Sequence, residues 1–93
     1  MTDFDFTISV PADRRYADTL RALAARAARQ AGCAAGEVEA FETEVHDAVL
    51  RCLAGASHPD VISVTLRQGA TDVEALIDCG RTIRVACHIP NVV

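Results

Sequence analysis

The sequence predicts a small α+β domain, a two-layer sandwich in which a helix pair covers one face of a mixed or antiparallel sheet. Segments with alternating apolar residues lie towards both ends of the chain, which is typical of half-buried strands. Two consecutive segments between them carry apolar residues at intervals of three and four, as amphipathic helices do. With 93 residues, 51% of them hydrophobic, and no long linker, residues 1–93 are expected to form one domain in the order β-α-α-β-β-β.

The first strand and the first helix occupy the N-terminal third of the chain. A strand is expected over residues 4–10, because apolar and polar side chains alternate there. Asp13 is a suitable N-cap for a helix over residues 14–31, and Gly32 suits its C-terminal stop. Alanines on the apolar side of this helix permit close packing, and its arginines are interpreted as a solvated face.

The second helix is expected over residues 36–54, with Gly55 as its stop. Its apolar stripe consists of Val38, Phe41, Val45, Ala48, Val49 and Cys52. Only a few residues connect it to the first helix, so the two helices should form an antiparallel pair.

Three further strands are expected over residues 61–67, 73–78 and 82–89, each with alternating apolar positions. The connection over residues 68–72 contains a glycine and predicts a hairpin, and residues 79–81 predict a second, tighter turn. The last strand is a candidate sheet edge, and an apolar edge needs a cover. A homodimer through this strand or through the helix faces is therefore expected.

Charge and hydropathy exclude several classes of protein. The net charge of −4 argues against a nucleic-acid-binding protein, which usually carries a basic face. No apolar run approaches the roughly 18 residues that span a bilayer, and the first residues do not resemble a signal peptide. The chain is therefore expected in the cytoplasm, without a membrane or nucleic-acid partner.

The four cysteines are Cys33, Cys52, Cys79 and Cys87. An even number permits two disulfides, but a cytosolic chain with an ordinary core favours buried free thiols. Their spacing with the histidines is irregular, so no metal site is predicted.

Ile77-Asp78-Cys79-Gly80 is the stretch with the most functional interest. An apolar strand ends in an aspartate there, and a glycine follows one residue later, where the backbone can turn sharply or admit a ligand. The plain interpretation is a hairpin turn with a polar residue at its corner.

Four segments together resemble the GHKL (Bergerat-fold, histidine-kinase-like) ATPases, and most closely their anti-sigma-factor serine kinases. They are residues 6–12, 44–51, 61–66 and 75–80. The resemblance implies a reduced Bergerat-like fold, a degenerate ATP-binding site and a role in bacterial signalling.

The family's helix motif places an acid one turn before an asparagine, and these positions hold Asp47 and Arg51 here. In the family the acid activates the attacking group, and the asparagine oxygen holds Mg²⁺. Arginine has no acceptor and cannot ligate a metal, although it can contact phosphate directly. An Asp47–Arg51 ion pair is favoured over a catalytic role for the acid.

The family's Asp-x-Gly-x-Gly motif implies that Asp78 would bind adenine and that Gly80 would let the backbone approach the nucleotide. Thr82 stands at the second glycine position, and a strand follows at once where the family has a glycine-rich lid and a helix. Without a lid the phosphates would remain in water, so a competent kinase is not expected.

Three functions remain open. The favoured one is a regulatory module without catalysis that binds a protein partner, such as a sigma factor, its antagonist or a two-component protein. The first alternative is a residual ATP-binding serine/threonine kinase that uses Asp78 for adenine, Asp47 as base and Mg²⁺ with ATP. The second alternative is an unrelated small α+β binding module.

Overall fold

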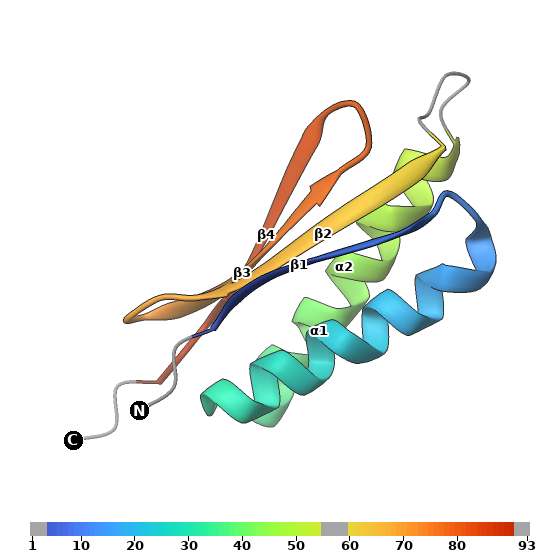
Figure 1. The fold of residues 1–93 in the computed structure, drawn as a ribbon. Helices are drawn as coiled ribbons and strands as arrows, with labels where there is room; N and C mark the ends of the chain where they lie inside the picture. The colour runs from blue at the N-terminus through green and yellow to red at the C-terminus, as the bar shows by residue number, and fades with distance from the viewer. Residues whose placement is uncertain (1–3, 55–59, 91–93) are drawn as a thin grey trace.

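A computed structural model describes residues 4–54 and 60–90 of the chain (Figure 1). Its elements are β1 (Asp5–Pro11), a short 3₁₀ turn η1 (Arg14–Tyr16), α1 (Ala17–Ala31), α2 (Ala35–Ala54), β2 (Val61–Gln68), β3 (Asp72–Asp78) and β4 (Thr82–His88). The predicted segments agree with these bounds to within a few residues, except that the first helix begins after the 3₁₀ turn. Gly55, the expected stop of the second helix, lies outside the described residues.

The four strands form one sheet in the order β1-β2-β3-β4. Each neighbouring pair is antiparallel, so the described strands contain no parallel pair. The predicted α+β class, with two helices and an antiparallel sheet, is confirmed. β1 and β4 are the two edges of this sheet.

The ends of the first helix follow from local hydrogen bonds. The Asp13 carboxylate accepts a hydrogen bond from the Arg15 backbone N–H at 3.0 Å, which lowers the pKa of Asp13 and stabilises the 3₁₀ turn. Asp13 therefore caps this turn and not α1 itself. Gly32 ends α1 as predicted, with a φ of 94° in the left-handed region that glycine tolerates best.

The two helices pack side by side as a hairpin on one face of the sheet (Figure 1). The buried residues of α1 are mostly alanines, which let α2 approach closely. Two polar contacts cross the helix pair: Arg21 to Glu42 at 3.7 Å and His46 to Asp18 at 3.2 Å. No described helix is both long and apolar enough to cross a membrane.

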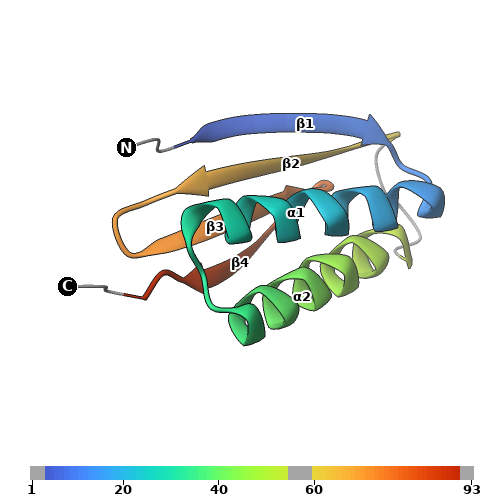
Figure 2. The ribbon, with the colours of Figure 1, turned by 90° about the horizontal axis from the view of Figure 1, so that it is seen from below.

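The helices do not cover the sheet evenly. α1 packs on β2 and β3, and α2 packs on β3 and β4. The buried strand residues are Ile62, Val64, Leu66, Val73, Ala75, Ile77, Val85 and Cys87. Strand β1 contributes no buried residue, and its Phe6 is 41% exposed. Seen from the helix side, β1 lies beyond α1 at the margin of the molecule (Figure 2).

The opposite face of the sheet is polar and open to solvent. Hydroxyl groups pair across β1 and β2, Thr7 with Thr65 at 2.8 Å and Ser9 with Ser63 at 2.9 Å. Ion pairs join all four strands and involve Asp5, Arg67, Glu74, Arg84 and Asp72. These cross-strand contacts support one register of the sheet.

Candidate functional site

Asp47 and Arg51 are both exposed on α2, away from its buried stripe. The expected ion pair between them is wrong, because none of the ion pairs among the described residues joins these two side chains. A single helical turn separates their backbones, but in solvent the entropy cost of ordering two side chains offsets the small Coulomb gain. Among the described residues, neither side chain has a hydrogen-bond or ion-pair partner that would orient it for catalysis.

Asp78 and Gly80 form the corner between β3 and β4. Alternation along β3 directs Val73, Ala75 and Ile77 towards the helices, so Asp78 lies on the open face of the sheet. Its Oδ1 accepts a hydrogen bond from the Gly80 backbone N–H at 3.3 Å. Because Gly80 has a φ of 95°, this is a turn in which the aspartate stabilises the loop.

The residues singled out from the sequence do not converge. Asp47 and Arg51 belong to the helix layer, whereas the Asp78 carboxylate lies on the far side of the sheet. Four cavities are lined by residues of the described ranges, and none of the four includes Asp47, Arg51 or Asp78. The site implied by the family resemblance is therefore not assembled by these side chains.

A disulfide joins Cys52 of α2 to Cys79 in the β3–β4 turn, with their Cα atoms 5.9 Å apart. The prediction of free thiols is wrong for these two cysteines. Cys52 belongs to the inward stripe of α2, and Cys79 follows Ile77 by two residues and therefore points to the same side. The bond closes the space between the C-terminal part of α2 and the end of β3.

The other two cysteines, Cys33 and Cys87, are free and buried, as predicted. Burial raises the pKa of the Cys87 thiol from its ordinary value of 9.0 to about 12, and a hydrogen bond with Cys33 acts in the same direction. At neutral pH Cys87 is therefore a thiol, and the thiolate that reacts with electrophiles or metals is suppressed.

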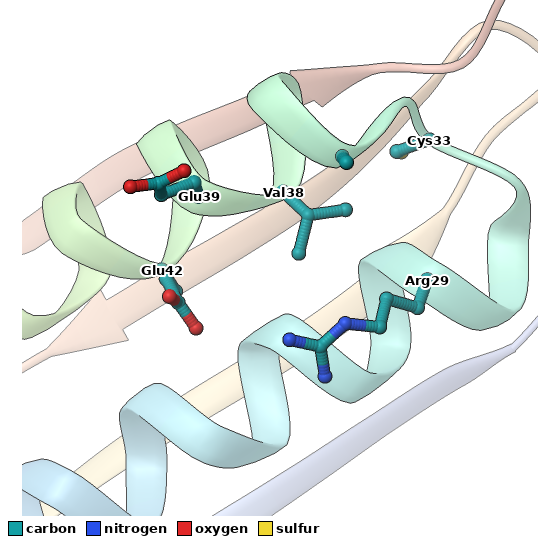
Figure 3. Close-up of a pocket in the computed structure, with 6 residues that line it drawn as sticks. Arg29, Cys33, Val38, Glu39 and Glu42 are labelled. Atoms are coloured by element: carbon teal, nitrogen blue, oxygen red, sulfur yellow. The ribbon is translucent and has the colours of Figure 1, made fainter.

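A cavity of about 460 Å³ lies between the last turn of α1 and the first turns of α2. It is lined by Arg29, Cys33, Ala35, Val38, Glu39 and Glu42. Figure 3 shows the Arg29 side chain extending from α1 towards α2, with the two carboxylates and Val38 on the opposite wall. Two carboxylates against one guanidinium make the lining acidic on balance, which opposes binding of phosphate groups.

Sequence analysis missed this cavity. The arginines of the first helix, Arg29 among them, were expected to form a solvated face. A signal was present, because acids three residues apart near the start of α2 must lie opposite the end of α1 in a tight helix hairpin. The volume of the cavity between the two helices depends on side-chain packing, which the order of residues in the sequence does not predict.

A second groove, of about 250 Å³, separates β1 from α1. Its lining is Phe4, Phe6, Leu23, Arg26, Ala27 and Gln30. The rings of Phe4 and Phe6 lie 5.8 Å apart and form its apolar wall. The groove exists because α1 sits mainly over β2 and β3 and covers the helix side of β1 only in part.

The described residues contain no group of three or more His, Cys, Asp or Glu side chains placed to hold a metal ion. Comparison with protein-family models and with curated proteins found no match to this chain.

Proposed function

We propose that this chain is a regulatory signalling module that binds a protein partner and has no catalytic activity. On this proposal its framework is a reduced, lid-less form of the Bergerat-like fold that the sequence resembles. The observation that carries the proposal is the Cys52–Cys79 disulfide, which ties α2 to the β3–β4 turn next to Asp78 and Gly80.

The geometry around this bond opposes nucleotide binding. A base held near the end of β3 with its phosphates near Arg51 would lie between α2 and the β3–β4 turn. For a flat ring to fit between two layers, the layers must be roughly 7 Å apart, which is the sum of two van der Waals contacts. The Cα atoms of Cys52 and Cys79 are only 5.9 Å apart, and Asp78 points to the other face of the sheet.

The cavity between α1 and α2 is better suited to contact with a protein partner than to a nucleotide. The cavity between α1 and α2 combines an apolar floor with Arg29, Glu39 and Glu42, a mixed set of charges that can pair with side chains of both signs. The family resemblance suggests a sigma factor, its antagonist or a two-component protein in the cytoplasm as the partner. Arginine is a common anchor in such contacts.

The absence of nucleotide binding is tested by isothermal titration of the oxidised protein with ATP and ADP, each with and without Mg²⁺. We expect no saturable heat in any titration and no difference between the wild-type protein and Asp78→Asn. Saturable binding that Asp78→Asn abolishes would contradict the proposal and favour the residual kinase.

Partner binding is tested by titrating purified candidate sigma factors and their antagonists into this protein. Arg29→Ala is expected to weaken binding by about tenfold, roughly 1.4 kcal/mol, because it removes the one cation that lines the cavity. Arg81→Ala, an exposed arginine of the β3–β4 turn, is the matched control and should bind like the wild type. Equal losses for both variants would place the contact outside the cavity.

A further inference from the structure

The two edges of the sheet are protected to different degrees. The helix side of β4 is covered by α2, and Arg84, near the middle of β4, makes ion pairs with Glu74 and Asp72. β1 has less of both: its one charged residue, Asp5, lies at the end of the strand and pairs with Arg67, residues 6–10 are uncharged, and Phe6 is 41% exposed. Charge and cover are the usual means of preventing edge strands from pairing, so β1 is the edge open to another strand.

Hydrogen bonds to β2 show which backbone groups of β1 are free. The Phe4 carbonyl accepts a hydrogen bond from the Gln68 N–H at 2.8 Å, and the Ala12 N–H donates to the Asp60 carbonyl at 2.8 Å. Even-numbered residues of β1 therefore face β2, because orientation alternates along an antiparallel strand. The N–H and C=O groups of the odd-numbered residues point away from the sheet, and only β2 pairs with β1 among the described strands.

We propose that a second copy of this chain pairs with this edge, with the two β1 strands antiparallel and centred on Thr7. Thr7 then faces Thr7 of the second copy, and Asp5 faces Ser9. In this register the outward N–H and C=O groups of Asp5, Thr7 and Ser9 meet those of Ser9, Thr7 and Asp5 of the second copy. Each of these pairs exchanges two backbone hydrogen bonds. Pro11 has no N–H and stays outside the ladder.

The side chains of β1 match in this register. On the helix side, Phe6 faces Ile8 of the second copy and Phe4 faces Val10, so the exposed rings gain apolar neighbours. On the open side, the Thr7–Thr65 hydroxyl pair at 2.8 Å continues through Thr7 of the second copy. No two like charges are opposite one another, since Asp5 meets a serine.

The match between the two β1 strands favours a second copy over an unrelated strand. Two-fold symmetry places the two α1 helices antiparallel on the same side of the joined sheet. Each α1 is offset over β2 and β3, so the contact consists of the two β1 strands and uses none of the residues that line the proposed partner cavity.

The dimer is tested by light scattering after size exclusion over a series of protein concentrations. We expect the mass of two chains for the wild type and of one chain for Thr7→Pro, which removes an N–H that makes no bond within the chain. Ala86→Pro is the matched control, because Ala86 is an outward-facing residue on the edge of β4, and it should remain a dimer. Thr7→Lys, which places like charges at the symmetry axis, should also be monomeric, and circular dichroism verifies that each variant is folded.

The register is tested with Thr7→Cys under mild oxidation. Residues that face one another in a hydrogen-bonded pair have Cα atoms about 5.5 Å apart, within the range of a disulfide. Thr7→Cys should therefore give a covalent dimer, whereas Thr82→Cys on β4 and the wild type should not. A monomeric wild type, including one that pairs only with a different protein, overturns the proposal. So does a dimer that persists in Thr7→Pro and Thr7→Lys, or one that Thr82→Cys links and Thr7→Cys does not.

Discussion

Phe41→Ala is expected to destabilise the protein by about 3–5 kcal/mol. Phe41 is 1% exposed and is the largest of the fully buried side chains. It lies on the inward stripe of α2, so its removal leaves a cavity between the helix layer and the sheet. Domains of this size are stable by on the order of 5–15 kcal/mol, so a large part of the folding free energy would be lost. Urea unfolding followed by circular dichroism measures the change.

Two variants control for the loss of aromatic area itself. Phe41→Leu keeps an apolar side chain at the site and should cost less than Phe41→Ala. Phe6→Ala, measured in dilute solution, removes a ring that is already 41% exposed and should cost about 1 kcal/mol or less. If Phe6→Ala and Phe41→Ala were equally destabilising, the helix layer would not cover the sheet as described.

Removal of the disulfide by Cys52→Ala with Cys79→Ala is expected to lower the free energy of unfolding by about 3 kcal/mol. The bond joins residues separated by 27 positions and so restricts a large loop of the unfolded chain. It also holds the C-terminal part of α2 to the β3–β4 turn. Urea unfolding of the oxidised wild type and of the double variant measures the difference.

A reductant supplies the control. Dithiothreitol should bring the wild type close to the stability of the double variant and should leave the double variant unchanged. Cys33 and Cys87 are free in both proteins, so they do not contribute to the difference. If the oxidised and the reduced wild type had the same free energy of unfolding, the disulfide would not contribute to stability and the prediction would be wrong.

Much of the fold could be predicted because local periodicity determines which side chains share a face. The alternation from Phe4 to Val10 and the three-and-four spacing around Phe41 each belong to one element and need no distant contact. The 3₁₀ turn at residues 14–16 was not predicted. Its cause is the carboxylate of Asp13, which bonds the Arg15 N–H two residues on and tightens the first turn.

The candidate site could be predicted only in part. The exposure of Asp47 and Arg51 on one helix follows from their spacing, and so does the position of Asp78 at the end of a strand. Alternation along β3 also places Asp78 on the face of the sheet away from the helices. Which residue of the β3–β4 turn lies against α2 is a long-range property, and the packing brought Cys79 to Cys52.

By itself, the sequence determined the class of the fold, the extent of its helices and strands and the face that each strand buries. These properties depend on the order of apolar and polar residues within single segments. Only the tertiary structure decided that Cys52 bonds Cys79, that Arg29 lies across from Glu39 and Glu42, and that β1 is the least covered strand. Each depends on the lateral position of the helix pair over β2, β3 and β4, which is settled by packing between segments far apart in the chain.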